Sequence, residues 1–128
     1  MISKKIKYVD FNNKEHEDEF LFNLSRAEVA QMELSTTGGM TDMINRIVKA
    51  EDGAKITELV VDMILKSYGE KSPDGLRFVK SAELSKAFSE TGAYDALFIE
   101  LLTEPDKAAA FIEGVLPKPV NLPPKSNL

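Results

Sequence analysis

The sequence predicts an α+β fold that is mostly α-helical: an N-terminal β-hairpin, about six short helices and an extended, Pro-rich C-terminal tail. Two observations support this prediction. Apolar residues alternate with polar residues before Ser25 and recur at helical spacing after it, and four of the six prolines lie beyond Leu116. We therefore expect a single domain over residues 1–116, followed by a flexible tail over residues 117–128.

Two strands are expected at the N-terminus. Residues 4–11 and 19–24 show the alternation that is typical of half-buried strands, and the second run places Phe20 and Phe22 on its buried face. Asn12-Asn13 lies between the two runs and favours a tight turn, because asparagine tolerates a positive φ. The two strands are therefore expected to form a β-hairpin.

Helices are expected from Ser25 onward. Ser25 and Glu28 have the spacing of a capping box, so a helix should begin there and run to about Leu34. The longest apolar stripe extends over Ile56–Tyr68, and we expect it to form the central core helix. Four further helices are expected, each with an apolar face: residues 40–48 (Met40, Met43, Ile44, Ile47, Val48), 81–90 (Leu84, Ala87, Phe88), 94–102 (Tyr94, Leu97, Phe98, Leu101, Leu102) and 105–116 (Phe111, Ile112, Val115, Leu116).

Local signals mark where these helices begin and end. Gly69 should end the core helix, and Lys71–Gly75 has the turn chemistry of a substantial exposed loop. Ser81 is placed to cap the next helix, Thr91-Gly92 separates two helices, and Pro105 suits the first turn of the last one.

Two segments are candidates for contact with a partner. An isolated hairpin is marginal in water, so it must pack on helices or pair with another chain through its open edge, where Ile6 and Tyr8 lie. The tail cannot continue a helix and carries Val120 and Leu122 among its prolines. We therefore expect Ile6, Tyr8, Val120 and Leu122 to bind a partner.

Composition argues against several classes of function. The 128 residues carry 16 Lys and Arg against 21 Asp and Glu, and this net charge of −5 gives no basic footprint for nucleic acid or an anionic membrane. There is no cysteine, which removes disulfides, thiolate nucleophiles and Cys-based metal sites. No apolar stretch has the length of a signal peptide core or a membrane span, so we expect neither export nor membrane insertion.

No motif predicts catalysis or a cofactor. His16 is the one histidine and lies in the acidic run Glu15–Glu19, but a strand sends neighbouring side chains to opposite faces, which argues against a metal site. The sequence has no Gly-x-Ser-x-Gly elbow, and Gly38-Gly39 is followed by Met40 rather than by the Lys of a phosphate-binding loop. We expect no enzyme activity, no metal and no cofactor.

Two surface interpretations stay open. Met32, Met40, Met43 and Met63 fit either an adaptable binding groove or core filling, and core filling is favoured because three of them lie on apolar stripes. A modest basic cluster fits either a solvated loop or contact with an acidic partner, and the solvated loop is favoured because the protein is acidic overall: Lys66, Lys71, Arg77 and Lys80.

Over roughly residues 5–117 the chain resembles the tail assembly chaperones of long, non-contractile-tailed bacteriophages. Five segments carry this resemblance, the third being the most distinctive: Phe20–Ser25, Met32–Met40, Leu65–Phe78, Ser85–Thr91 and Ala108–Ile112. The resemblance implies a non-enzymatic protein of the host cytoplasm that is absent from the mature virion. Its implied partners are further copies of itself, the tape measure protein, which it keeps soluble, and the tail tube subunits, which it recruits. No site residue is transferred from the family.

The resemblance also implies a longer form made by programmed frameshifting. Such phages commonly produce it near the end of the short gene, and Pro123-Pro124-Lys125 or Leu116-Pro117-Lys118 is compatible with a slippery coding sequence.

Two other readings of the protein remain. A small phage or prophage regulatory protein would bind DNA or a host protein through its short helices, although no helix is rich in Lys and Arg. A structural tail subunit would be found in purified virions, where a chaperone is absent.

Overall fold

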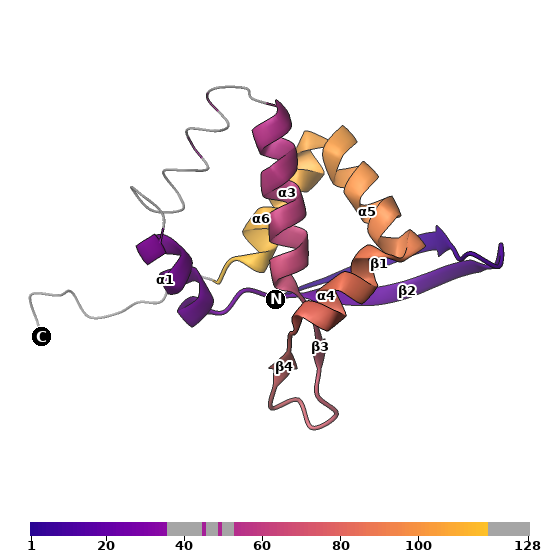
Figure 1. Cartoon of the computed structure of the whole chain (residues 1–128), viewed down its shortest axis with the longest axis horizontal. Helices are drawn as coiled ribbons and strands as arrows, with labels where there is room; N and C mark the ends of the chain where they lie inside the picture. Colours follow the sequence, from indigo (N-terminus) through magenta and orange to yellow (C-terminus); the bar gives the residue numbers. More distant parts are fainter. Residues whose placement is uncertain (36–44, 46–48, 50–52, 118–128) are drawn as a thin grey trace, which may run out of the picture.

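The computed structural model describes residues 1–35, 45, 49 and 53–117, which form an α+β fold with four strands and five helices (Figure 1). The predicted class is therefore confirmed. The expected helix over residues 40–48 falls outside the described residues except for Asn45, as does the tail beyond Pro117. The elements are β1 (Ile2–Val9), β2 (Glu15–Phe22), α1 (Arg26–Ser35), α3 (Gly53–Ser67), β3 (Tyr68–Lys71), β4 (Phe78–Val79), α4 (Ala82–Ser89), α5 (Gly92–Thr103) and α6 (Pro105–Val115).

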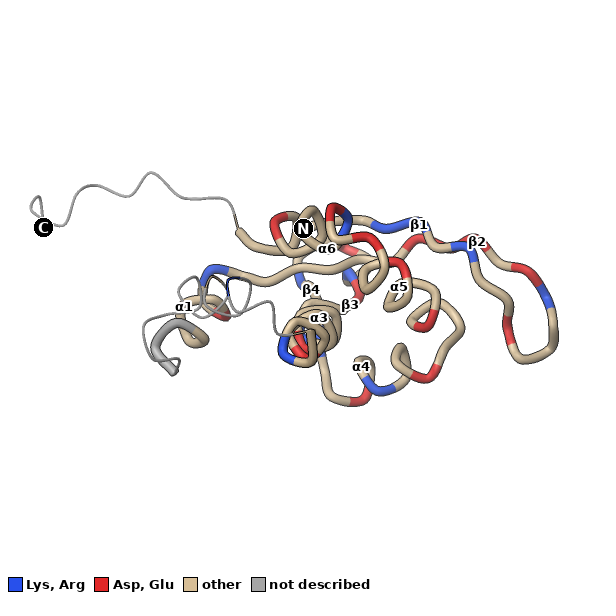
Figure 2. Tube along the Cα trace, turned by 90° about the horizontal axis from the view of Figure 1, so that it is seen from above, with Lys and Arg blue, Asp and Glu red and all other residues tan. Residues whose placement is uncertain are grey.

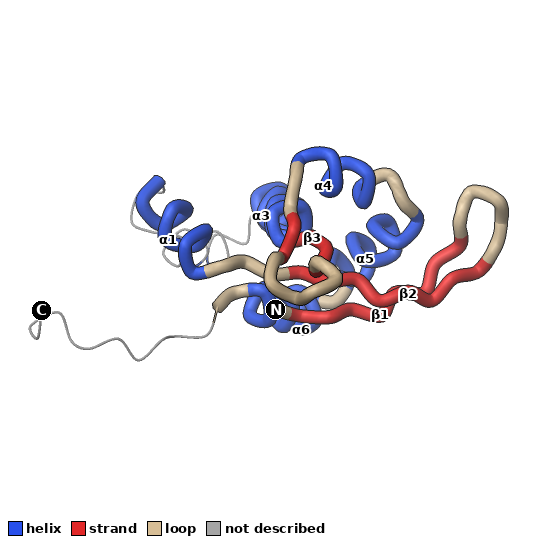
Figure 3. Tube along the Cα trace, turned by 90° about the horizontal axis from the view of Figure 1, so that it is seen from below, coloured by secondary structure: helices blue, strands red, loops and turns tan. Residues whose placement is uncertain are grey.

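The N-terminal hairpin forms as predicted. β1 and β2 are antiparallel in a register that pairs Ile2 with Phe22 and Val9 with Glu15. Asn13 has a φ of 62°, the positive value that the turn requires, and the Asp10 backbone N–H donates to the Lys14 carbonyl to close the loop. The turn end of this ribbon projects beyond the helices (Figure 3).

A second hairpin was not predicted from the sequence. We expected the core helix to run to Tyr68, but α3 ends at Ser67 and β3 pairs with β2, giving a sheet of order β1-β2-β3-β4. The Asn23 backbone N–H donates to the Ser67 carbonyl at 2.7 Å, which aligns the chain for this pairing. The turn expected over Lys71–Gly75 is confirmed from Ser72 onward, where the Gly75 backbone N–H donates to the Ser72 carbonyl at 2.8 Å, but the strands on either side of it were not expected. Tyr68 fits a helical stripe in the sequence, but its ring stacks on Phe88 with centroids 4.3 Å apart.

Capping explains where the helices begin. The Ser25 backbone N–H donates to Glu28 Oε1 at 2.9 Å, and the Glu28 N–H donates to Ser25 Oγ at 3.1 Å, so the predicted capping box is confirmed. Ser81 Oγ accepts from the Leu84 N–H, Thr91 Oγ1 accepts from the Tyr94 N–H, and Pro105 occupies the first turn of α6.

The core surrounds α3, as the longest apolar stripe predicted. Its buried side chains include Leu59, Val60, Met63 and Ile64, so Met63 fills the core. Next to α3, Phe22 is in edge-to-face contact with Phe88 and Phe111, at centroid distances of 5.7 and 5.2 Å, joining β2, α4 and α6.

Two side chains expected to point inward are exposed instead. Ala87 lies on the outer side of α4, because this short helix buries only Phe88 among its residues. Leu102 is 43% exposed near the end of α5, whereas its neighbour Leu101 is buried. Successive residues of a helix point about 100° apart, so the core covers one of this pair and leaves the other outside.

Candidate partner-binding surfaces

An apolar groove of about 730 Å³ lies between α3, α5 and α6, and we call it the helical groove. Leu101 forms part of its floor and Leu102 part of its exposed wall. The other lining residues are Asn45, Gly53, Ile56, Thr57, Leu59, Val60, Pro105, Ala108, Ala109, Ile112, Glu113 and Leu116.

The residue sizes along α6 explain why this groove is hollow. Ala108 and Ala109 are small and face the opening, whereas Ile112 and Leu116, one and two turns further on, are larger. Opposite them, the first turn of α3 begins with Gly53, which adds no side chain. The groove therefore exposes apolar side chains of the kind that bind a helix or an extended segment of a partner.

Acidic side chains border the helical groove. Glu113 lines it and makes no ion pair with any described residue, and Glu104 and Asp106 lie at its α5–α6 end. Lys107 Nζ lies 3.2 Å from both a Glu100 and a Glu104 oxygen, and hydrogen bonds to these two carboxylates raise the pKa of Lys107. The border therefore favours a partner that carries positive charge.

Glu100 on α5 connects this helix to the sheet and to α6. Its carboxylate accepts from Lys4 at 2.9 Å and from Lys107 at 3.2 Å, joining α5 to β1 and α6. Partial burial alone would raise the pKa of Glu100, but the hydrogen bonds from the two ammonium groups outweigh it and hold this pKa below its ordinary value.

The tip of the first hairpin forms a second exposed surface. Phe11 is 87% exposed there, and Val9 beside it is also exposed. Both signs of charge follow this hairpin, with acidic residues the more frequent (Figure 2). The tip is therefore an exposed apolar point on a hairpin of mixed charge.

Near His16, two aspartates are engaged in hydrogen bonds, Asp10 with His16 and Asp18 with Tyr8. His16 Nε2 lies 2.6 Å from Asp10 Oδ2, and the His16 ring stacks on Tyr8 with centroids 5.1 Å apart. The Tyr8 hydroxyl donates to Asp18 Oδ2 at 2.5 Å, and this hydrogen bond raises the pKa of Tyr8 to about 12. Among the described residues, no group of three or more His, Asp or Glu is arranged to hold a metal ion.

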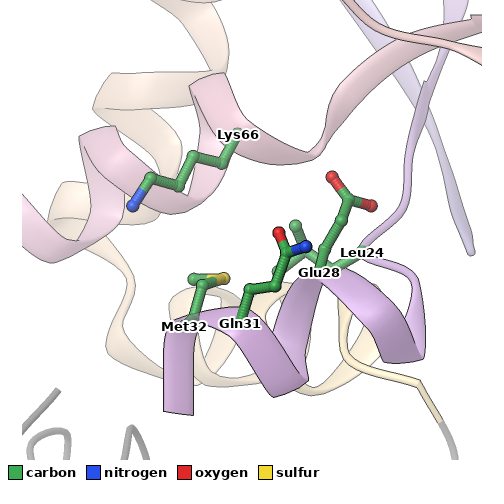
Figure 4. A pocket seen from close by; sticks show the side chains of 5 residues that line it. All are labelled: Leu24, Glu28, Gln31, Met32 and Lys66. Carbon is green, nitrogen blue, oxygen red and sulfur yellow. The ribbon is translucent and has the colours of Figure 1, made fainter. Parts of the chain in front are cut away.

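A small pocket of about 240 Å³ separates α1 from the end of α3 (Figure 4). It is lined by apolar and polar side chains together: Leu24, Glu28, Gln31, Met32 and Lys66. Two members of the basic cluster lie here and are paired, Lys80 with Glu28 at 2.7 Å and Lys66 with Asp62 at 2.9 Å. Lys71 and Arg77 of that cluster are exposed.

The comparison with known families identifies the chain. A family model described as phage tail assembly chaperone matches residues 1–123. The chain belongs to this family. No curated protein and no solved structure matches it. Membership in a chaperone family implies a non-enzymatic role in building a bacteriophage tail, and it confirms the resemblance noted in the sequence.

Four residues of the chaperone were expected to bind a partner, and the structure describes two of them, Ile6 and Tyr8. Ile6 is only 5% exposed and packs in the core, and Tyr8 is half-buried, so β1 presents mainly its backbone edge at these positions. Val120 and Leu122 lie outside the described residues. Within the part of the chain that is described, no helix has the length and apolar character needed to span a membrane.

Sequence reasoning missed the surfaces that the chaperone exposes most clearly. Helical spacing predicts that Leu101 and Leu102 both face the core, but of the two only Leu101 is buried. Alternation predicts a strand that extends to Phe11, but β1 ends at Val9 and Phe11 lies in the turn. A useful signal was its position next to Asn12-Asn13, where a hairpin reverses.

Proposed function

We propose that this chaperone self-associates, binds the tape measure protein and keeps it soluble until tail tube subunits, which it recruits, take its place. It acts in the host cytoplasm and does not remain in the mature virion. Membership in the tail assembly chaperone family supports the general role. The single observation that carries the finer proposal is the helical groove, an open apolar surface on a small acidic domain.

The shape of the groove suits a helical partner. It follows α6 from Pro105 to Leu116, a length of about 16 Å at 1.5 Å per residue, which equals about three turns of a second helix. A tape measure protein is expected to be long and helical, and a helix with apolar residues at i, i+3 and i+4 would place them against Leu102, Ala109 and Ile112. Each such contact is small, and many copies along one partner would bind through avidity while each stays reversible.

The described residues contain nothing that favours an enzyme over a binding protein. Ser67 is the buried polar side chain there, and its hydroxyl is used in donating to the Met63 carbonyl at 2.5 Å within α3. Two of the carboxylates with a lowered pKa, Glu28 and Glu100, are paired with lysines and lie on different helices. The other two, Asp10 and Asp74, accept hydrogen bonds within their own turns.

Coexpression with the tape measure protein tests the proposal, and α5 offers a matched pair of variants. Leu102 and Ile99 are similarly exposed, at 43% and 49%, but only Leu102 lines the helical groove. We expect Leu102→Gln to reduce copurification of the tape measure protein and Ile99→Gln to leave it unchanged. Equal loss in both variants, or clean separation of the wild-type pair at low salt and micromolar concentration, would contradict the proposal.

We also propose a longer frameshifted form as a partner of the 128-residue chain. An immunoblot of cells that carry the native gene with its downstream overlap, using an N-terminal tag, tests this. We expect a minor larger band whose mass spectrum joins the two frames near the Pro-rich segment. A single product of 128 residues would exclude frameshifting in that host and leave the coexpression result unaffected.

A further inference from the structure

We propose that the helical groove of one chaperone copy binds the tail segment Lys118–Leu122 of a second copy. This inference rests on the proposed self-association and names the two surfaces that make it. It is carried by three observations: the position where the described chain leaves the fold, the residue types that follow, and the charge at the border of the groove.

The chain leaves the fold at one end of the groove. Leu116, which lines the groove, has φ −71° and ψ 141°, so the backbone is already extended where α6 ends. The next residues are Pro117-Lys118-Pro119, in which each proline fixes its own φ and Pro119 restricts Lys118 to extended conformations. A reversal within these residues is disfavoured, and a reversal is what the chain would need to return along α6 into its own groove. These residue types therefore favour the groove of another molecule over the chain's own groove.

The segment that follows has the chemistry of an apolar anchor. Residues two apart share one side of an extended chain, so this segment would present Val120 and Leu122 together if it bound in an extended conformation. At about 3.3 Å per residue, the rise of an extended strand, the five residues from Lys118 to Leu122 would span about 16 Å, which matches the length of α6 along the groove. Two aliphatic side chains on one side of a stiff segment would complement the aliphatic wall formed by the exposed Leu102 and Ala109 and the half-buried Ile112.

Charge favours the tail over the hairpin tip, another exposed apolar feature of the chain. Residues 117–125 contain Lys118 and Lys125 and no acidic residue, whereas Glu113 borders the groove and makes no ion pair with the described residues. The hairpin end that bears Phe11 carries Lys14 but also Asp10 and Glu15, and its acidic side chains would face Glu113 with like charge. The tail is thus a better match for the groove than the hairpin tip.

The proposed contact joins two different surfaces, the tail of one copy and the helical groove of another. A copy whose tail lies in a neighbour's groove still presents its own groove to a third copy, so association proceeds head to tail and does not end at a dimer unless a ring closes. Such an arrangement provides many copies in a row, as a long partner requires. A tape measure helix that enters the same groove would displace the neighbour's tail, so loading and self-association would compete.

Disulfide trapping tests the contact directly, because the chain has no cysteine of its own. Full-length Leu122→Cys and a tagged full-length Ala109→Cys are mixed and oxidised, so that the mixed dimer has its own position on a gel. We expect this mixed dimer, and we expect little of it when Ala109→Cys is replaced by Lys86→Cys, which is exposed on α4 and does not line the groove. Equal yields from both positions would overturn the proposal.

The double variant Leu122→Cys/Ala109→Cys distinguishes the two possible sources of the tail. Preformed oligomers of this variant are diluted and then oxidised. Cross-links between chains under these conditions support a second copy as the source of the tail. A product cross-linked within one chain at every concentration would overturn the proposal in favour of the chain's own tail.

A charge exchange gives an independent test that does not involve oxidation. Glu113→Lys and Lys118→Glu should each weaken self-association about fivefold in sedimentation velocity, and the double variant should restore it. Glu83→Lys, on the exposed side of α4, is the matched control and should have no effect. Failure of the double variant to recover, with all variants folded by circular dichroism, would overturn the proposal.

The proposed function is tested separately by capture of the tape measure protein with the wild-type chain. If tape measure capture succeeds while trapping and charge exchange fail, the proposed function stands and the tail contact is rejected. If the tape measure protein is captured and the tail contact is also observed, a helical peptide from the tape measure protein should reduce the yield of the mixed dimer. An unchanged yield would show that the peptide and the tail do not bind the same groove.

Discussion

Lys80 donates to both carboxylate oxygens of Glu28, at 2.7 and 2.8 Å, although the two residues are 52 positions apart in the sequence. Glu28 is also the carboxylate of the capping box that begins α1, so one side chain both starts this helix and ties it to the segment after β4. Lys80 in addition donates to the Lys66 carbonyl at 3.1 Å, near the end of α3. This cluster holds α1 against the rest of the described fold.

Lys80→Met should destabilise the protein by about 1 kcal/mol, a modest value because Glu28 is partly exposed and solvent screens the pair. Urea denaturation followed by circular dichroism measures this change. Lys86→Met, on the exposed side of α4, is the control and should change the free energy of unfolding little. Equal changes in the free energy of unfolding for Lys80→Met and Lys86→Met would show that the Glu28–Lys80 pair does not stabilise the fold.

The same pair predicts an acid dependence of stability. Burial alone would raise the pKa of Glu28, but hydrogen bonds from Lys80 and Ser25 outweigh it, so this pKa is lower in the folded protein than the ordinary 4.5. The contribution of Glu28 is therefore fully present above pH 4.5 and is lost as the pH falls through the lower folded pKa. As the pH falls through this range, the free energy of unfolding should decrease more steeply for the wild type than for Lys80→Met. Parallel curves of stability against pH would contradict a role for the Glu28–Lys80 pair.

Gly69→Ala should destabilise the protein by about 2 kcal/mol, because the second hairpin leaves no room for a side chain there. An added Cβ would lie 2.6 Å from Phe78 Cε2 and 2.7 Å from the Val79 carbonyl oxygen, and the backbone atom cannot move aside easily. Gly53→Ala is the matched control, since nothing lies within 4 Å of its Cβ position. Thermal melting should show a loss for Gly69→Ala alone.

Asn13→Val should cost about 1–2 kcal/mol, because a β-branched residue is disfavoured at the φ of 62° that Asn13 adopts. Asn13→Gly should be tolerated, since glycine adopts this conformation without steric cost. Asn12→Val is the control: Asn12 uses its backbone N–H to donate to Asp10 Oδ1 at 2.8 Å, and valine keeps that group. Chemical denaturation of the three variants should rank Asn13→Val as the least stable.

Alkaline titration should show no tyrosine that ionises near pH 10. The hydrogen bond to Asp18 raises the pKa of Tyr8 to about 12, and burial raises the pKa of Tyr68 and Tyr94. Because the neutral phenol of Tyr8 is favoured in the folded state, its contribution to stability is complete below pH 10 and is lost as the pH rises through about 12.

Phenolate absorbance at 295 nm measures this titration. Asp18→Asn removes the charged acceptor and should bring one of the three tyrosines to a lower midpoint. An unchanged titration curve in Asp18→Asn would show that the Tyr8–Asp18 hydrogen bond does not control the phenol.

Local sequence patterns were sufficient to predict the elements whose causes lie within a few residues. Asn12-Asn13 predicted the first turn, Ser25 and Glu28 predicted the start of α1, and the stripe over residues 56–68 predicted the core helix, because turns, caps and helix periodicity depend on near neighbours. The family was also recognisable at this level, from strings such as Leu65–Phe78.

Which of these elements contact one another depends on packing between segments that are far apart in the sequence. The second hairpin depends on the Asn23–Ser67 hydrogen bond and on the close approach of Gly69 to Phe78, contacts between segments that no local pattern connects. The helical groove depends in the same way on which of Leu101 and Leu102 the neighbouring helices cover. Helical periodicity marks both leucines as apolar, and long-range packing selects the one that stays exposed.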